Sequence, residues 1–412
     1  MSLAAPDIDR STLGLHSLAQ YEPIIGRKAA DRIAGKAERV GTLRVAHVSS
    51  TFYGGGVTEI LTPLTLMMNA IGIETDWHLI QGTPAFFGCT KKLHNMLQGA
   101  DIDFPEVDRQ IYEQVVFENA TRIHVEECDA VIVHDPQPLP LVHHIAERRM
   151  PWFWQCHVDL SSPHPPTWKY LQQFVGQYDA AIFSLPEYGQ NLGIDELFVT
   201  PAINPFSAKN VELSDSEIDD CLTQHGIPPD RPLVAQVSRF DVWKDPKGVI
   251  EAFRMARKEV DCTLVLIGNN ASDDPEGETI LEDIKRSIDD GIIVLAVDDP
   301  ILVNALQRRA AVILQKSTRE GFGLTVTEAM WKGAAVIGGN VGGIRRQIVD
   351  GENGFLVDSV DQAAKRIVQI LKDPALRQRL GRRAKESVRE KFLMSRLLED
   401  WLDILARYQR PV

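Results

Sequence analysis

Short apolar runs alternate with amphipathic segments along most of the chain. The first run, Leu43–Val48, precedes a glycine-rich turn and a helix-like stretch over Val57–Ile71. Strand, turn and helix in this order are typical of a parallel α/β sheet. The pattern predicts further strands at Glu74–Ile80, Ala130–His134, Trp152–His157, Ala180–Ser184, Pro232–Ser238, Cys262–Gly268, Ile292–Leu295, Ala311–Gln315 and Ala335–Ile337. It predicts further helices at Ala29–Val40, Pro246–Glu259, Ile301–Arg308, Leu324–Lys332 and Arg377–Tyr408.

The alternation pauses over Thr200–Ser216 and then resumes, which predicts two domains joined by a linker. We expect an N-terminal arm over residues 1–40 that packs on a first Rossmann-like domain over 41–205. A second Rossmann-like domain should occupy 206–390, and a C-terminal helix over 391–412 should cross back to the first. Doubly wound α/β sheets bind ligands beyond the carboxyl ends of their strands, so the two domains should face a central cleft.

Composition excludes several classes of protein. The 412 residues include 44 Lys+Arg and 57 Asp+Glu, giving a net charge of −13, which is unfavourable for nucleic-acid binding. The five cysteines are scattered without a CxxC pair, which favours free thiols in a reducing compartment. No apolar stretch is long enough to span a membrane, and the N-terminus lacks the features of a signal peptide. We therefore expect a cytoplasmic protein without nucleic-acid or membrane partners.

The segment Glu320-Gly-Phe-Gly-Leu-Thr-Val-Thr-Glu328 carries the strongest candidate chemistry. Gly321 and Gly323 allow a close approach of backbone to ligand, and the N–H groups of the following helix suit a diphosphate. Glu328, one or two turns into the helix, can accept hydrogen bonds from two adjacent hydroxyls, while Glu320 stays at the loop mouth. A glycine helix cap flanked by two solvated glutamates is the alternative.

A second segment, Ser238-Arg-Phe-Asp-Val-Trp-Lys-Asp-Pro-Lys247, follows a predicted strand. Arg239 and Lys244 lie five residues apart in a turn, so both cations can converge on one anion. Solvation of both is the alternative. Because no cluster of carboxylates accompanies them, electrostatic stabilisation of a departing diphosphate needs no bound metal or other cofactor, although Mg²⁺ can accompany a nucleotide.

Together these segments resemble a known family. Glu-x7-Glu after a strand, with Ser-Arg-Phe and a lysine in the preceding strand–helix turn, is similar to the retaining glycosyltransferases of the GT-B fold, family GT4. More specifically, the chain resembles the trehalose synthases of the glycosyltransferring type. That similarity is carried by TKKLHNMLQG (90–99), HDPQPLPL (134–141), VSRFDVWKDP (237–246), REGFGLTVTEAMWKG (319–333) and VGGIRRQIVDGENGFLV (341–357).

The resemblance implies a reaction and roles for residues. A nucleoside-diphosphate glucose should transfer its glucose, with retention, to free glucose, giving trehalose and nucleoside diphosphate. The second domain should bind the donor and the first the acceptor. Arg239 and Lys244 should hold the diphosphate, Glu328 the ribose hydroxyls, and Glu320 the donor glucose. Further donor contacts are implied for Gly321, Phe322, Gly323, Leu324 and Thr325, for Gly54, Gly55 and Gly56, and for His157 as the active-site histidine.

Several first-domain residues are weaker acceptor candidates. His134, Asp135 and Gln137 follow a strand and can bind hydroxyls, although His-Asp-Pro also suits a cap and turn. Lys92 and Asn95 match the family, but a solvated helix face is the alternative. Three alternative functions remain. They are a trehalose phosphorylase, a different GT4 retaining glycosyltransferase that uses another acceptor, and a non-catalytic nucleotide-sugar-binding protein. The sequence is compatible with UDP, ADP or GDP as the nucleotide of the donor, and with a homodimer.

Overall fold

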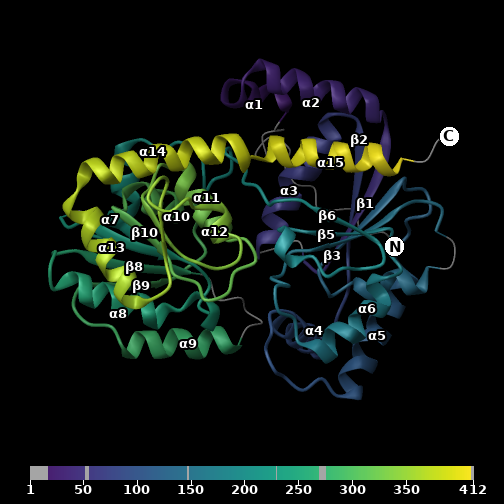
Figure 1. Ribbon diagram of the computed structural model, residues 1–412, viewed down its shortest axis with the longest axis horizontal. Helices are drawn as coiled ribbons and strands as arrows, with labels where there is room; N and C mark the ends of the chain where they lie inside the picture. The colour runs from purple at the N-terminus through teal and green to yellow at the C-terminus, as the bar shows by residue number, and fades with distance from the viewer. Residues whose placement is uncertain (1–16, 52–54, 146–147, 229, 269–274, 410–412) are drawn as a thin grey trace. The chain divides into compact units, whose positions relative to one another are not determined.

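The computed structural model describes residues 17–51, 55–145, 148–228, 230–268 and 275–409. Internal contacts divide the chain into two compact units, described separately below. Unit 1 comprises Met1–Pro201 and Met394–Val412, and unit 2 comprises Ala202–Leu393. Each unit is built on a six-stranded parallel sheet with helices against it (Figure 1). The predicted architecture of two doubly wound α/β units is confirmed.

The sheet of unit 1 has the strand order β2-β1-β3-β4-β5-β6. From β1 the chain continues to β2 on one side and then crosses to β3 on the other, so the strand order reverses between β1 and β3. Ligands bind at the carboxyl end of such a reversal in open α/β sheets. The strands are β1 Leu43–Ser49, β2 Ile73–Leu79, β3 Ala130–His134, β4 Trp152–Cys156, β5 Ala180–Phe183 and β6 Asp195–Phe198.

Helices from both ends of the chain belong to unit 1. The helix α15 (Met394–Tyr408) packs against α2 (Arg27–Val40) and α3 (Gly55–Ala70) (Figure 1). Its amphipathic sequence explains this position, because Leu397, Leu398, Trp401, Leu402, Ile404 and Leu405 form its buried side. The remaining helical segments of unit 1 are α1 Leu18–Ile25, α4 Pro84–Leu97, α5 Glu106–Ala120, η1 Leu139–His144, α6 Pro165–Val175 and η2 Pro186–Tyr188.

Unit 2 repeats the design with the strand order β12-β11-β10-β7-β8-β9, which reverses between β7 and β10. Its apolar core includes side chains of α8, α13 and the central strands. The strands are β7 Leu233–Val237, β8 Thr263–Gly268, β9 Ile292–Ala296, β10 Val312–Gln315, β11 Val336–Gly339 and β12 Phe355–Val357. The helices are α7 Asp215–Gln224, η3 Val242–Lys244, α8 Pro246–Arg257, α9 Pro275–Arg286, α10 Pro300–Arg309, α11 Leu324–Trp331, α12 Ile344–Gln347, α13 Val360–Lys372 and α14 Pro374–Lys391.

One predicted element is wrong. The sequence pattern predicted a single helix over Arg377–Tyr408, but α14 ends at Lys391 and α15 begins at Met394. Between them, Leu393 forms an isolated parallel bridge with Ile203, whose N–H donates to the Phe392 carbonyl at 2.9 Å. This pairing interrupts the helix, although the apolar periodicity continues across the break. No helix in the described part of the chain is both long and apolar enough to cross a membrane.

Candidate active site

The turns that follow β7 and β10 carry the two segments singled out in the sequence. These strands are neighbours in unit 2, and the strand order reverses between them. The first turn runs from Ser238 to the start of α8, and the second runs from Lys316 to the start of α11. Because parallel neighbours end at the same edge of a sheet, the topology brings both turns to the usual ligand edge.

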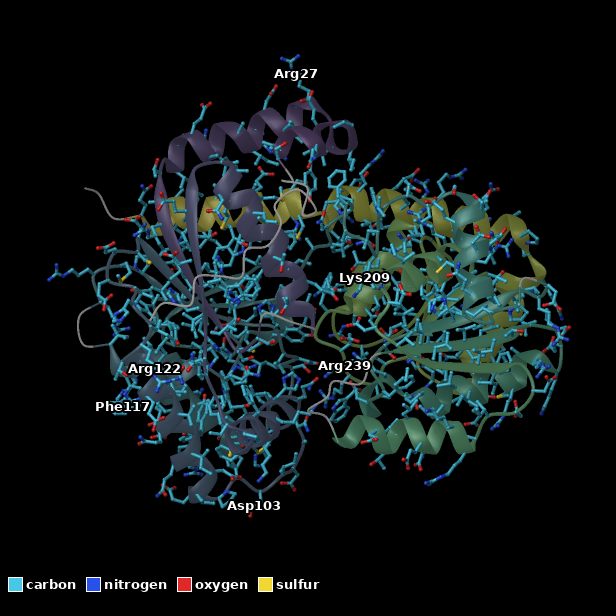
Figure 2. The ribbon with its side chains drawn as sticks, turned by 180° about the vertical axis from the view of Figure 1, so that it is seen from behind. Arg27, Asp103, Phe117, Arg122, Lys209 and Arg239 are labelled. Atoms are coloured by element: carbon cyan, nitrogen blue, oxygen red, sulfur yellow. The ribbon has the colours of Figure 1, made fainter. Side chains whose placement is uncertain are left out.

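The β7 turn is held in one shape by side chains from its own strand and loop. The Gln236 amide donates to the Lys244 carbonyl at 3.0 Å, and the Lys244 N–H donates to the Asp241 carboxylate at 3.2 Å. Asp241 is buried and lies 3.4 Å from Arg239 Nη2, while the Arg239 side chain is 48% exposed (Figure 2). The guanidinium is therefore anchored at one side and accessible at the other.

Lys244 and Glu320 are brought together across the two turns. Lys244 Nζ lies 2.5 Å from Glu320 Oε2, and the Ser317 hydroxyl donates to the same oxygen at 3.2 Å. The lysine side chain is 15% exposed and the glutamate 12%, so this ion pair is largely shielded from water. The structure thus joins the proposed diphosphate cation to the proposed sugar-binding carboxylate, a contact that their 76-residue separation concealed.

The side chain of Gln347, which was not a candidate in the sequence, holds the glycine-rich turn in place. Gln347 donates to the carbonyls of Phe322 at 2.7 Å and Gly323 at 3.3 Å, and the Thr327 hydroxyl donates to Gln347 Oε1 at 2.6 Å. The turn also requires a residue without a side chain at position 343, because a Cβ on Gly343 would lie 2.4 Å from the Phe322 Cα. The signal was present in the quoted run 341–357, which contains both Gly343 and Gln347.

Gly323 occupies the N-cap position directly before α11 and adopts the left-handed conformation, with φ 88° and ψ 65°. Without a side chain it cannot cap the helix, and the first N–H groups of a helix have no acceptor within the helix. The amides around Leu324 and Thr325 are thus chemically suited to an anion. This geometry fits the ligand contacts expected for the turn.

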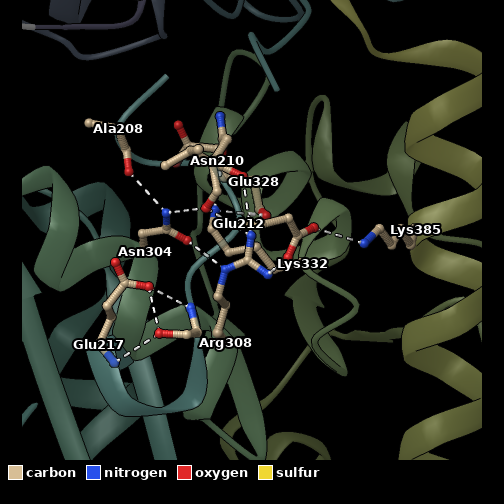
Figure 3. A network of polar contacts seen from close by, with 11 residues as sticks. Ala208, Asn210, Glu212, Glu217, Asn304, Arg308, Glu328, Lys332 and Lys385 are labelled. Carbon is tan, nitrogen blue, oxygen red and sulfur yellow. Dashed lines mark hydrogen bonds and ion pairs between the residues drawn. The ribbon is translucent and has the colours of Figure 1, made fainter. Parts of the chain in front are cut away.

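Glu328 lies on α11 and is 3% exposed, so the alternative of two solvated glutamates is wrong for this residue. One turn later, Lys332 Nζ donates to the Glu328 carbonyl at 3.1 Å, to Gln307 Oε1 at 2.8 Å and to Asn210 Oδ1 at 2.8 Å (Figure 3). Burial lowers the pKa of Lys332 to about 7, and the Glu328 charge opposes that shift. Glu328 is therefore held on a fixed helix above a buried polar network.

Three histidines form a row in unit 1 that runs across β1, β3 and β4 toward the carboxyl ends of these strands. His134 ends β3, and its ring nitrogens lie 3.0 Å from His47 Nδ1 and 3.2 Å from His157 Nε2. Burial lowers the pKa of His47 to about 3 and also lowers the pKa values of His134 and His157, so all three are neutral near pH 7. His134 and His157 were separate candidates in the sequence, whereas His47 was not a candidate.

Asp135 is fixed beside this row. It adopts a left-handed backbone with φ 61°, and its Oδ1 accepts a hydrogen bond from the backbone N–H of His157 at 2.8 Å. Burial raises its pKa above the usual value. Gln137 is half-buried, and its Oε1 has no hydrogen-bond partner among the described residues. Asp135 thus presents a fixed oxygen atom near the end of β3, and Gln137 presents one that is unpaired within the described part of the chain.

The remaining candidates of unit 1 are less closely tied to this edge. Lys92 on α4 forms an ion pair with Asp108 on α5, with Nζ 2.6 Å from Oδ2, and thereby joins two helices. Asn95 lies half-buried on the same helix. Gly55 and Gly56 begin α3, whereas Gly54 lies outside the described residues. Among the described residues, no group of three or more His, Cys, Asp or Glu could hold a metal ion.

The fold and the sequence define the class of protein. Residues 218–387 match the family model of glycosyl transferases group 1. A solved structure described as "Trehalose-6-phosphate from E. coli bound with UDP-2-fluoro glucose" superposes with a TM-score of 0.73 at 12% identity, covering 88% of this chain and 99% of that one. The protein is a glycosyltransferase of the GT-B fold.

Sequence relatives narrow this class to one family. Residues 47–190 match the model of the trehalose synthase N-terminal domain. The trehalose synthase of Pyrococcus horikoshii is 43% identical, over 97% of this chain and 98% of that protein. The trehalose synthase of Rubrobacter xylanophilus is 40% identical, over 97% of this chain and 99% of that protein. The chain belongs to the trehalose synthase family, which confirms the resemblance found in the sequence.

Proposed function

We propose that this protein is a retaining glucosyltransferase that makes trehalose from a nucleoside-diphosphate glucose and glucose and releases the nucleoside diphosphate. Membership of the trehalose synthase family supports the product. The observation that carries the donor chemistry is the shielded Lys244–Glu320 pair beside the N-terminus of α11. A cation, a carboxylate and free helix amides together suit an activated sugar with an anionic leaving group.

In this proposal the ion pair rearranges when the donor binds. A diphosphate oxygen competes for Lys244 Nζ, and Arg239 adds a second, more exposed cation. Glu320, now released, accepts hydrogen bonds from hydroxyls of the donor glucose. The backbone N–H groups of Gly321, Phe322 and Gly323 donate hydrogen bonds to oxygen atoms of that sugar. The diphosphate thus replaces Glu320 as the anionic partner of Lys244, and the sugar hydroxyls replace Lys244 as hydrogen-bond donors to the Glu320 carboxylate.

Glu328 binds the ribose hydroxyls of the nucleotide. Its place on α11 and the buried network beneath it, including Lys332, restrict its movement. A carboxylate can accept from two vicinal hydroxyls at once, and hydrogen bonds to a charged acceptor are stronger than neutral ones. A ribose contact specifies a nucleoside but not its base, so the base preference is a separate question.

The residues of unit 1 bind the sugars. His157 contacts the donor glucose, and Asp135 and Gln137 provide polar atoms for the acceptor. His134 is an unsuitable acceptor ligand, because its two ring nitrogens already pair with His47 and His157. Gly55 and Gly56, at the start of α3, contribute backbone N–H groups to the diphosphate or the reacting sugar. Lys92 is already held by Asp108, which favours a structural role for it over acceptor binding.

The transfer proceeds on one face of the donor sugar. The bond between the anomeric carbon and the phosphate oxygen breaks, and a bond from that carbon to the acceptor oxygen forms. The acceptor's proton passes to the departing phosphate oxygen, so charge and atoms balance without a covalent enzyme intermediate. Arg239, Lys244 and the amides of Gly323–Thr325 stabilise the negative charge as it develops.

The test is whether nucleoside diphosphate release depends on the acceptor. Purified protein is incubated with UDP-, ADP- or GDP-glucose, with and without glucose, and the released nucleotide is quantified. The proposal predicts release that requires glucose. A parallel arm offers trehalose with inorganic phosphate. Phosphorolysis of trehalose without nucleotide would favour the phosphorylase alternative, and glucose-independent release would show hydrolysis instead of transfer.

A further inference from the structure

His47, His134 and His157 form a diagonal across the sheet of unit 1. His47 in β1 is opposite Ile132 in β3, and His134 lies two residues beyond Ile132. His134 in turn is opposite Gln155 in β4, and His157 lies two residues beyond Gln155. Since residues two apart on a strand share a face, each step keeps the imidazole on the same face and moves it toward the carboxyl edge. The row therefore connects the sheet interior to the proposed sugar site.

The hydrogen bonds in this row are coupled. A neutral imidazole has one N–H donor and one bare nitrogen acceptor. His134 uses both ring nitrogens: its Nε2 pairs with His47 Nδ1, and its Nδ1 pairs with His157 Nε2. If His134 accepts from one neighbour, it must donate to the other, so both bonds run in the same direction. The three rings hold either all their protons on Nδ1 or all on Nε2.

The inner end of the row meets a tryptophan of the C-terminal helix. The ring of Trp401 on α15 contacts the His47 ring edge-to-face, with centroids 6.5 Å apart. His47 Nε2 and Trp401 Nε1 are both buried, and neither has a hydrogen-bond partner among the described residues. An indole N–H can only donate. A bare Nε2 on His47 can satisfy that donor through one bridging water, whereas a protonated Nε2 would leave two unpaired donors in the same buried ring contact.

We propose that Trp401 fixes the direction of the His47–His134–His157 chain, so that all three histidines carry their proton on Nδ1 and His157 offers an N–H donor to the sugar. Trp401, His47 and His134 are then positioning residues for His157. The role of His157 toward sugar rests on the proposed function, but the tautomers do not. The neutral state required for the chain agrees with the burial of the three rings.

Nitrogen NMR tests the chain in the unliganded protein. In ¹⁵N-histidine-labelled protein near pH 7, two-bond proton–nitrogen correlations distinguish an Nδ1–H ring from an Nε2–H ring. Single His→Phe variants assign the signals. The proposal predicts Nδ1–H in His47, His134 and His157 together. An Nε2–H form of any of the three, or a charged ring among them, would overturn the proposal even if the enzyme makes trehalose.

The Trp401→Phe variant tests the origin of the direction, with Trp152→Phe as its matched control. Trp152 is also fully buried in unit 1, and its Nε1 also lacks a partner among the described residues, but its ring contact is with Tyr178. Trp401→Phe should allow an Nε2–H population at all three histidines, whereas Trp152→Phe should not. Unchanged tautomers in folded Trp401→Phe protein would exclude Trp401 as the determinant.

Kinetics then separate the chain from the proposed function. Loss of one neutral hydrogen bond to sugar should lower kcat/KM by about 2- to 10-fold in Trp401→Phe relative to Trp152→Phe. If the tautomers change as predicted but kcat/KM for transfer to glucose does not, the contact of His157 with sugar is wrong, although the chain itself stands. Where Trp401→Phe fails to fold, the wild-type spectrum alone decides the direction.

Discussion

At the level of single residues, Lys244 is the cation proposed to stabilise the departing diphosphate, and its ammonium contacts Glu320 in the unliganded protein. We predict that Lys244→Ala lowers kcat by about 10²-fold or more, since removal of one preorganised donor to a developing negative charge has effects of that size. Turnover of nucleotide-glucose with glucose measures this. Lys247→Ala is the control. Lys247 lies close to Lys244 in the sequence, but its side chain is 66% exposed and forms a surface ion pair with Asp283.

Glu328 gives a second residue-scale prediction. Glu328→Gln keeps the shape but removes the charge that accepts the ribose hydroxyls, so the Kd of nucleoside diphosphate should rise about 10- to 100-fold. Calorimetric titration measures this, with the exposed residue Glu251→Gln of α8 as control. Unchanged nucleotide affinity in Glu328→Gln would remove Glu328 from the ribose site. The thermal midpoint is recorded in parallel, because the buried Lys332 loses a nearby opposite charge.

Much of the candidate site could be recognised in the sequence, because the residues proposed to bind the donor cluster in two short segments. Arg239, Lys244, Glu320 and Glu328 were recognisable as candidates from their chemistry and spacing. The contact between Lys244 and Glu320 was not, since it depends on β7 and β10 being neighbours in the sheet. The histidine row was also hidden, because it depends on the register of three strands.

At the element scale, the turn before α11 depends on close packing against Gly343. We predict that Gly343→Ala displaces the turn, because the new Cβ would lie 2.4 Å from the Phe322 Cα. Donor kcat/KM should fall by at least about 10-fold, since misplacement of positioned groups by an ångström has large effects on rate. The matched control is Gly88→Ala in α4, where the new Cβ meets no atom within 4 Å, and where alanine should stabilise the helix. Equal activity in both variants would contradict the positioning role of the turn.

The elements themselves were predicted to different degrees. Buried parallel strands such as β7 and β8 are continuous apolar runs, and these were recognised. The edge strand β6 (Asp195–Phe198) escaped because its residues, DELF, are half-exposed and acidic, so they lack a strand pattern. The break between α14 and α15 escaped because the pairing of Leu393 with Ile203 is a tertiary contact across a long sequence separation.

At the scale of the whole molecule, ion pairs tie the N-terminal helix α2 to the C-terminal helix α15 within unit 1. Arg32 donates to Glu399 at 2.7 and 2.9 Å, and Lys36 lies 2.9 Å from Glu399 and 2.6 Å from Asp403. The hydrogen bonds from Arg32 hold the pKa of Glu399 at about 2, well below its usual range. Because the folded pKa is depressed, the ionised carboxylate stabilises the fold above the unfolded pKa.

That stabilisation should be lost as the pH falls from about 4.5 toward 2. We predict that Glu399→Gln lowers the thermal midpoint at neutral pH and that its difference from wild type shrinks over this acid range. Melting curves at several pH values measure the difference. Glu38→Gln, on the exposed side of α2, should leave the wild-type profile unchanged. A constant offset between Glu399→Gln and wild type down to pH 2 would contradict the assigned role of this carboxylate.

Retaining transfer to glucose is tested by an NMR time course of the purified protein. The protein is incubated with unlabelled glucose and a nucleoside-diphosphate glucose that carries ¹³C at the anomeric carbon. The account predicts that the label appears in a non-reducing disaccharide with an α,α linkage, at the rate at which nucleoside diphosphate is released. Label appearing in free glucose, in a disaccharide with a reducing end, or in a β linkage would contradict retaining transfer to glucose.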